Sequence, residues 1–339
     1  MSIEPDGPES VNSIEFGPVE TPDHSAHAAA LARAGTLRLG KLGTIGAWVA
    51  GCQGHCPPRP CTRPRMVVFA ADHGIAAREV SAREVGSTAD LLGALRTGDS
   101  AAGVFAEVAG AGVRVVDVGL DSDSAAEFRV RRSSGSIDVE DALTDDEVRA
   151  ALRAGMTVAD AEVDAGADLL LAGNVGAGAS TPASTLVAAL TGTEPVEVIG
   201  RGSGIDDHAW MRKAAAVRDA LRRGRPVAAD PLALLRTVGG ADIAGLSGFL
   251  AQAAVRRTPV LLDGVVVAAA AMVAEELAPG AHEWWLAAQS TLEPAHRLAL
   301  DQLSLEPMLD LGVTAEAGTG AAAALPLVIM ATRALAALS

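Results

Sequence analysis

The chain has 339 residues, of which 49% are hydrophobic and only 20% charged. That much apolar surface can offset the entropy lost on ordering the chain, which excludes disorder over most of its length. Acidic residues number 42 and basic residues 27, giving a net charge of −15, and such a field repels nucleic acid and anionic membranes at long range. Partners of both kinds are therefore not expected.

The first 20 residues contain several acids where a secretory signal would have a basic region followed by an apolar run. We expect residues 1–20 to be a loose segment and residues 21–339 to form the folded unit. The two longest apolar stretches, 265–274 and 321–331, fall short of the roughly 18 to 20 residues that span a bilayer. These observations favour a cytoplasmic protein without a membrane anchor.

Three cysteines, Cys52, Cys56 and Cys61, lie with His55 in a proline-rich stretch. Three thiols and an imidazole would suffice as zinc ligands, but the spacing contains no C-x-x-C pair and prolines crowd it. An odd number of cysteines is typical of reduced thiols. We therefore favour a surface loop over a zinc site and expect no metal and no cofactor.

Short apolar runs recur along the chain, each followed by a glycine or polar turn and then by an alanine-rich stretch of helical composition. Short apolar runs with few polar interruptions indicate strands covered on both faces, and intervening helices indicate parallel connections. The sequence therefore predicts an α/β fold, a three-layer, Rossmann-like sandwich around a parallel sheet. The predicted strands are 66–70, 113–118, 169–172, 196–199, 260–262 and 284–288.

The clearest helix is predicted over residues 144–165. Thr144 offers an N-cap, acids follow it in the first turn, and apolar residues then recur at helical spacing.

Glycine clusters mark where a ligand would bind, because ligands of open parallel sheets lie beyond the carboxyl ends of the strands. The stretch 173–181 follows a predicted strand and precedes a helix, so its amides and hydroxyls could hold a phosphate. Residues 202–204 and 318–320 repeat the arrangement, with tight turns for helix packing as the alternative interpretation. The spacing matches neither dinucleotide nor triphosphate motifs, which favours a monophosphate. Lys213 is either a partner of that phosphate or a solvated surface lysine.

Read together, ordered blocks spanning most of the chain resemble the nicotinate-nucleotide:dimethylbenzimidazole phosphoribosyltransferases of cobalamin biosynthesis. The blocks are Asp72-His73-Gly74, Val80-Ser81-Ala82, 166–178, 202–207, Gly239-Gly240-Ala241-Asp242, 254–259 with Asp263-Gly264, Glu293-Pro294, 296–300, and 318–321.

The resemblance implies a large α/β domain over roughly 60–310, a small helical domain built from the chain-terminal segments, and a homodimer. It also implies a reaction that moves the phosphoribosyl group of nicotinate mononucleotide onto a benzimidazole-like base, giving α-ribazole 5′-phosphate. Such chemistry needs a phosphate anchor, an apolar slot for a flat base, and a carboxylate that accepts the azole proton. No metal is implied.

Carried over residue by residue, the resemblance assigns two groups of residues. Phosphate and ribose would be bound by Gly176, Gly178, Ser180, Thr181, Gly202, Ser203, Gly204, Lys213, Gly318, Thr319 and Gly320. The base would be bound by Ser81, Asp90, Asn174 and Thr291.

The chain departs from the family pattern around the reacting groups. Family members read Gly-Glu-Gly-Ser/Thr-Gly, whereas this chain has Ala317 at the glutamate position and Glu316 one residue earlier. Adjacent side chains of an extended segment point in opposite directions, so Glu316 would serve only if the backbone shifted. Asn174 replaces an acid and Asp90 a glutamine.

Further differences are Gln289-Ser290 in place of His-Arg and the lack of a Lys-Pro pair within 35–44. Two functions remain open. One is an active phosphoribosyltransferase with Glu316 or Asp90 as proton acceptor. The other is a catalytically impaired paralog that binds nucleotide or pairs with an active family subunit as a heterodimer.

Overall fold

The computed structural model describes residues 14–84, 86–123 and 125–338, so the expectation for residues 1–13 lies outside the described part. Residues 14–20 have no regular secondary structure, yet they are not loose. Ile14, Phe16 and Val19 pack against the main hydrophobic core, and the indole Nε1 of Trp284 donates to the Glu20 carbonyl at 2.8 Å. The apolar residues of this segment explain the difference, because the acids beside them can remain in solvent.

The described residues form one parallel five-stranded sheet, in the order β2-β1-β3-β4-β5. The strands are β1 (Pro64–Ala71), β2 (Gly112–Gly119), β3 (Leu169–Val175), β4 (Val260–Leu262) and β5 (Trp285–Ala287). Five of the six predicted strands are thus confirmed, and so is the parallel α/β architecture.

The sixth prediction, a strand over 196–199, is wrong. These residues form most of a short helix, α7 (Pro195–Val198). Proline at the first helical position has the backbone angle that a helix start requires. Val196 is also 62% exposed, whereas a central strand of this sheet would bury it.

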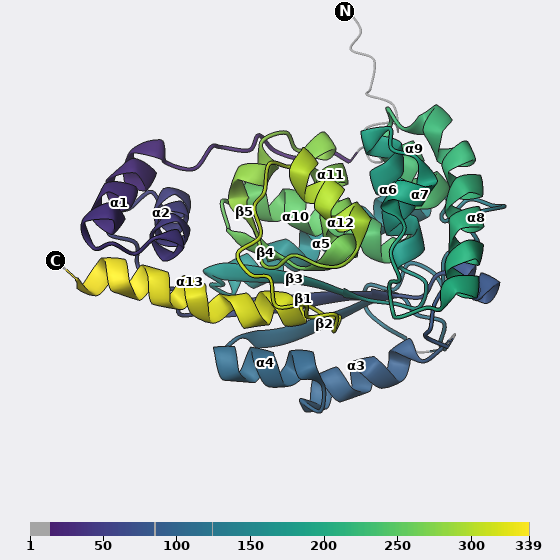
Figure 1. Ribbon diagram of the computed structural model, residues 1–339, viewed down its shortest axis with the longest axis horizontal. Coiled ribbons are helices and arrows are strands. Elements are labelled where there is room, and N and C mark those ends of the chain that lie inside the picture. The colour runs from purple at the N-terminus through teal and green to yellow at the C-terminus, as the bar shows by residue number, and fades with distance from the viewer. Residues whose placement is uncertain (1–13, 85, 124, 339) are drawn as a thin grey trace, which may run out of the picture.

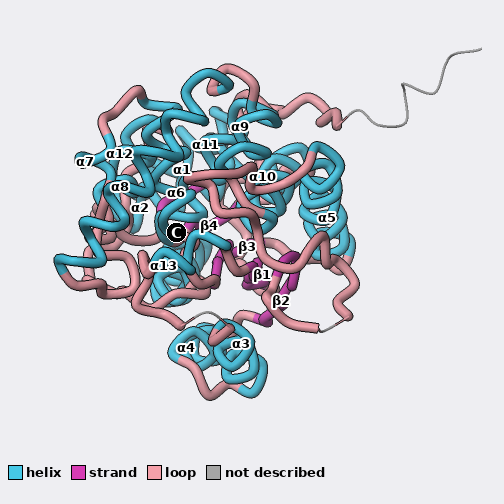
Figure 2. The backbone as a smooth tube through the Cα atoms, turned by 90° about the vertical axis from the view of Figure 1, so that its right-hand side faces the viewer, coloured by secondary structure: helices cyan, strands magenta, loops and turns pink. Residues whose placement is uncertain are grey.

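Helices cover both faces of the sheet (Figures 1 and 2). Alternate side chains of β1 separate the two cores: Val67 and Phe69 face one helical layer, and Met66 and Val68 face the other. The first layer contains α5 (Asp145–Asp164), α6 (Ser180–Thr191), α8 (Asp207–Gly224), α9 (Pro231–Val238), α10 (Ala241–Val255), α11 (Gly264–Leu277) and α12 (Pro294–Gln302). The second contains α3 (Thr88–Thr97), α4 (Ala101–Ala109) and α13 (Thr319–Ala337).

Helix α5 confirms the prediction over 144–165 and shows why glycine is needed in this layer. Thr144 and Glu147 form a reciprocal capping box at its start. A Cβ on Gly155 would lie 1.9 Å from the Gly245 carbonyl oxygen of α10, and one on Gly248 would lie 2.2 Å from the Leu152 carbonyl oxygen. The two helices therefore approach each other backbone to backbone.

Helices from both ends of the chain pack together beside the sheet (Figure 1). They are α1 (His24–Thr36), α2 (Lys41–Gln53) and the second half of α13, joined by a small alanine-rich cluster with Leu335. Arg33 of α1 donates to the Leu335 carbonyl at 2.8 Å. This packing agrees with a small unit built from the terminal segments, although the division into two domains stays a prediction.

Helix α13 is longer than the apolar stretch 321–331 suggested, because it continues through Pro326 and Arg333 to Ala337. It is long and apolar enough to cross a membrane, but half of the window that meets this criterion is buried within the fold. Its buried face packs on α2 and α4, as expected of a core helix.

The cysteines do not form the surface loop that their prolines suggested. Cys52 belongs to α2, Cys61 is buried, and all three thiols are free. Burial raises the pKa of the Cys61 thiol to about 12. Over the described ranges, no group of three or more His, Cys, Asp or Glu side chains is arranged to hold a metal ion.

Candidate active site

A cavity of about 860 Å³ opens at the carboxyl ends of β3, β4 and β5. Asn174 and Gly176 reach it from the end of β3, Asp263 follows β4, and Gln289 comes shortly after β5. Loops after α7 and before α12 and α13 complete its wall. Most of the expected site residues line it: Ser81, Asn174, Gly176, Gly178, Ser180, Gly202, Ser203, Gly204, Thr291, Glu316 and Gly318, together with Ala317.

Lys213 is buried directly behind one end of the cavity, so the interpretation as a solvated surface lysine is wrong. It is 0% exposed on α8, and its ammonium donates to the Ser180 hydroxyl at 3.0 Å and to the Gly200 carbonyl at 3.4 Å. The Glu293 carboxylate lies 3.9 Å away. Burial lowers the pKa of Lys213, and Glu293 opposes that effect.

The glycine loop at the end of β3 leads to Ser180, whose hydroxyl contacts this ammonium. Gly176 has no room for a side chain, since a Cβ would lie 1.8 Å from the Ala71 carbonyl oxygen. Gly178 has a left-handed backbone with φ of 82°. Ser180 then begins α6 and accepts from Lys213. Thr181 is fully buried in α6 and does not reach the cavity.

The other two glycine loops do not follow strands as expected. Residues 202–204 come after the short helix α7, and residues 318–320 lead into α13. The Gly320 amide donates to the Asp263 carboxylate at 2.7 Å, and the Thr319 hydroxyl donates to the Glu316 carbonyl at 2.5 Å. Gly320 and Thr319 therefore serve the turn itself, and only Gly318 of this loop lines the cavity.

Glu293 is a residue of the cavity to which sequence reasoning assigned no role. Its carboxylate accepts from the Gly202 amide at 2.6 Å. A Cβ on Gly200 would lie 2.3 Å from the same carboxylate, so glycine is required there. Glu293 thus occupies an amide of the loop that was expected from the sequence to bind phosphate. Its place in front of Pro294, the first residue of α12, is the signal that could have marked it.

Asp263 was also missed as a site residue, although its position directly after β4 marks the ligand-binding edge. Its buried carboxylate accepts from the Gly320 amide and, at 3.0 Å, from Gln289 Nε2. It therefore satisfies backbone donors at the start of α13. Burial raises the pKa of Asp263, and these hydrogen bonds oppose the change. Gln289 also donates to the Val313 carbonyl at 3.2 Å and so joins β5 to the loop that carries Glu316.

Glu316 enters the cavity because the chain around it is a tight turn and not an extended segment. Ala317 has φ of 61° and Gly318 has φ of 81°. The Ala317 amide donates to the Asn174 carbonyl at 2.9 Å, which fixes the turn to the end of β3. The expectation that an extended segment would turn Glu316 away from the site therefore does not apply to this backbone.

The Glu316 carboxylate is paired with Arg83. Arg83 Nε donates to Oε1 at 3.1 Å, and a second guanidinium nitrogen lies 3.0 Å from Oε2. Burial raises the pKa of Glu316, and the charge of Arg83 acts in the opposite direction.

Asn174 is held from behind by buried polar side chains. Its Nδ2 donates to the Asp242 carboxylate at 2.7 Å and to the Phe69 carbonyl at 3.3 Å. Asp242 also contacts His73 Nε2 at 3.1 Å, and both side chains are fully buried. These contacts fix which face of the Asn174 amide is turned toward the cavity.

Of the remaining expected residues, Ser81 and Thr291 reach the cavity and Asp90 does not. The Ser81 hydroxyl lies 3.2 Å from that of Ser203, and the Thr291 hydroxyl lies 2.9 Å from His296 Nδ1. Burial lowers the pKa of His296 to about 4. Asp90 is exposed in the first turn of α3, where the neighbouring Thr88 is the residue that turns inward. The structure therefore does not place Asp90 as a proton acceptor.

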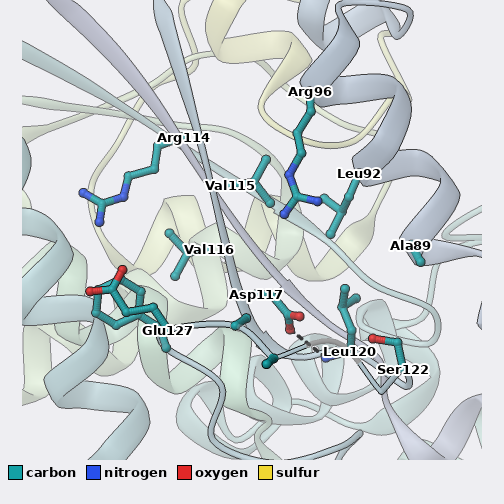
Figure 3. A pocket seen from close by; sticks show the side chains of 13 residues that line it. Ala89, Leu92, Arg96, Arg114, Val115, Val116, Asp117, Leu120, Ser122 and Glu127 are labelled. Atoms are coloured by element: carbon teal, nitrogen blue, oxygen red, sulfur yellow. Dashed lines mark hydrogen bonds between the residues drawn. The ribbon is translucent and has the colours of Figure 1, made fainter.

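A second cavity, of about 510 Å³, lies beside the edge strand β2 and under α3 (Figure 3). Arg96 and Arg114 extend into it on either side of Val115 (Figure 3). Arg114 is stacked 5.7 Å from the ring centre of Phe128 and also pairs with Glu162. The Asp117 carboxylate accepts from nearby backbone amides. Among the described residues that line this cavity, none is a glycine and Ser122 carries the one hydroxyl.

The fold and the cavity agree with comparisons to known proteins. A family model described as Phosphoribosyltransferase matches residues 19–339, and the chain belongs to this family of phosphoribosyl-transferring enzymes. A Mycobacterium ulcerans protein is 55% identical over 331 residues, 95% of this chain and 92% of the relative. A Mycobacterium avium protein is 55% identical, covering 95% of each chain. Both relatives are named nicotinate-nucleotide--dimethylbenzimidazole phosphoribosyltransferase.

Solved structures lead to the same family. A crystal structure of nicotinate-nucleotide-dimethylbenzimidazole phosphoribosyltransferase from Thermus thermophilus is similar with a TM-score of 0.86 at 34% identity. The match covers 93% of this chain and 96% of that one.

Proposed function

We propose that the protein transfers the phosphoribosyl group of nicotinate mononucleotide to 5,6-dimethylbenzimidazole or a related base, giving α-ribazole 5′-phosphate and nicotinate. One observation carries this assignment within the family. A single cavity has glycine amides at one end, with the buried Lys213 ammonium behind them on Ser180, and an ionisable carboxylate, Glu316, in another part of its wall.

The residues divide the reaction between them. Lys213, Ser180 and the amides near Gly176 and Gly202 anchor the 5′-phosphate, which positions the sugar. The bond between the anomeric carbon and the nicotinate nitrogen breaks, and its electron pair returns to the pyridine ring. One azole nitrogen forms the new bond to that carbon, and the proton of the other azole nitrogen passes to the Glu316 carboxylate.

Glu293 must give up the Gly202 amide, or share it, when a phosphate arrives, because two anions cannot accept the same hydrogen bond at full strength. The remaining base contacts expected from sequence, Ser81, Asn174 and Thr291, lie on the cavity wall. The comparisons offer no support for the alternative of an impaired, binding-only paralog, since relatives at 54% to 55% identity carry the name of the enzyme. A homodimer or heterodimer, and a cytoplasmic location, remain predictions.

The test is nicotinate release from nicotinate mononucleotide in the presence of dimethylbenzimidazole, with α-ribazole 5′-phosphate identified by mass. Glu316→Gln should lower kcat by about 10² to 10⁴-fold, the usual effect of losing a general base. Glu306→Gln, at an exposed residue outside the cavity, is the matched control and should leave kcat unchanged. A wild-type protein that releases no nicotinate above the blank would refute the proposal.

A further inference from the structure

The segment from Glu79 to Arg83 connects the phosphate end of the cavity to the carboxylate of Glu316. Arg212 of α8 donates to the Glu79 carbonyl at 3.0 Å. The Ala82 amide donates to the Ser203 hydroxyl at 2.9 Å. Residues 81–83 line the cavity. The segment is thus tied to α8 and to the Gly202–Gly204 loop before it reaches Glu316.

Arg83 ends this segment in a fixed position. Its own amide donates to the Ser81 hydroxyl at 3.1 Å, and two nitrogens of its guanidinium face the two carboxylate oxygens of Glu316. A planar guanidinium opposite a carboxylate restrains orientation as well as distance. The side chains of Arg83 and Glu316 are 24% and 31% exposed, so the pair is neither solvated nor sealed off.

The backbone of Glu316 is held independently of Arg83. Both polar atoms of the peptide group after Glu316 are hydrogen-bonded: the Ala317 amide donates to the Asn174 carbonyl, and the Glu316 carbonyl accepts from the Thr319 hydroxyl. Arg83 is the contact that restrains the side-chain torsions of Glu316.

The other charged side chains of the cavity are engaged elsewhere. Asp263 is bound to Gly320 and Gln289, Glu293 to Gly202 beside Lys213, and Arg201 to Asp207 and the Ile205 carbonyl. On the other elements at the turn, β3 presents Asn174 and α13 presents Thr319, which are both uncharged. Arg83 is thus the charge that opposes the desolvation of the Glu316 carboxylate.

We propose that Arg83 is a positioning residue, which holds Glu316 in the cavity as an oriented carboxylate ready to accept the azole proton. The inference rests on the proposed function, and it adds a residue that contacts the proton acceptor and not the substrate. The charge of Arg83 also opposes the desolvation that raises the pKa of the Glu316 carboxyl.

The pH profile of kcat, measured with both substrates saturating, separates this role from a structural one. Removing a cation from beside a carboxylate raises the pKa of that carboxyl by about 1 to 3 units. Arg83→Gln should therefore move the acid limb of the profile upward by about one pH unit or more and lower kcat below that limb. The KM for nicotinate mononucleotide should change by less than about threefold. Arg83→Lys keeps the charge, so it should retain the wild-type limb while losing part of kcat because the paired geometry is lost.

Arg212→Gln is the matched control. It removes an arginine of α8 that contacts the same segment at the Glu79 carbonyl, and it should leave the acid limb in place. Should Arg83→Gln be too slow to assay, carbon-13 NMR titration of proteins labelled at glutamate measures the pKa of the Glu316 carboxyl directly. The signal of Glu316 is the one that is missing from the Glu316→Gln protein.

An unchanged acid limb in Arg83→Gln would overturn the inference, and so would a rise in the KM for nicotinate mononucleotide with an unmoved limb, which would make Arg83 a substrate contact. Either result leaves the proposed function standing if Glu316→Gln is inactive. Full activity of Glu316→Gln would instead remove Glu316 as the proton acceptor, whatever the Arg83 variants do.

Discussion

Replacing Lys213 by methionine tests the phosphate end of the cavity, because methionine fills similar space without the charge. The chain has only two lysines, Lys41 and Lys213, and only Lys213 is buried at the cavity. A hydrogen bond to a charged group is worth about 1.5 to 3 kcal/mol. Lys213→Met should therefore raise the dissociation constant for nicotinate mononucleotide roughly 10- to 150-fold.

Part of this loss comes from Glu293, whose carboxylate is then left without its cation, 3.9 Å away, and repels the phosphate. Adding Glu293→Gln to the Lys213→Met protein should recover some of the affinity. The assay is calorimetric titration with the mononucleotide, and thermal melting checks that each variant is folded. The exposed Lys41→Met protein is the control and should bind as the wild type does. An affinity within threefold of wild type in a folded Lys213→Met protein would refute a phosphate site next to this ammonium.

Two further predictions concern stability. Burial lowers the pKa of His296 in the folded protein to about 4, below the usual histidine value of 6.5, so the unfolded chain binds the proton first and stability falls as the pH drops below about 6.5. Between pH 7.5 and 5.5 this residue lowers the free energy of unfolding by about 1 kcal/mol. Urea unfolding of His296→Asn should show a fall in that free energy that is smaller by this amount. A pH dependence identical to that of the wild type would contradict the assignment. Gly155→Ala should destabilise the protein by several kcal/mol, since its Cβ would meet the Gly245 carbonyl oxygen. In the control variant Gly93→Ala, the new Cβ in α3 meets nothing within 4 Å, so this change should stabilise the protein by up to about 1 kcal/mol. Equal melting temperatures for these two glycine variants would show that the α5–α10 approach is not tight.

The strands were readable from sequence where apolar runs were bounded by turn residues and helices followed. The prediction failed at 196–199, where four apolar or mixed residues suit a strand or a helix equally well. Pro195, the residue before the run, indicates the helix, because it is the first residue of α7.

The position of Glu316 could not be predicted, because it depends on one backbone angle. Ala317 has a left-handed conformation, and alanine gives no sign of this in a sequence, whereas glycine or asparagine would. The contact that holds the turn, from the Ala317 amide to the Asn174 carbonyl, joins residues far apart in the chain. Arg83 was equally invisible, since its partner lies more than 200 positions away.

Asp263 and Lys213 illustrate the opposite cases. Asp263 directly follows a confirmed strand, so strand-end logic alone was sufficient to mark it. The burial of Lys213 depends on how α8 packs against α6 and on the Ser180 hydroxyl that accepts its hydrogen bond. Neither contact can be predicted from the residues next to Lys213 in the sequence.

Helix α13 begins with the turn that carries Glu316 and ends among α1 and α2. With 19 residues it extends for about 28 Å, and Pro326 interrupts its hydrogen-bond ladder near the middle. The helix therefore connects the chain-terminal helices directly to the turn that carries Glu316. A tilt of about 5° at one end displaces the other by about 2 Å over that length, a shift comparable to the distance that makes or breaks a proton transfer.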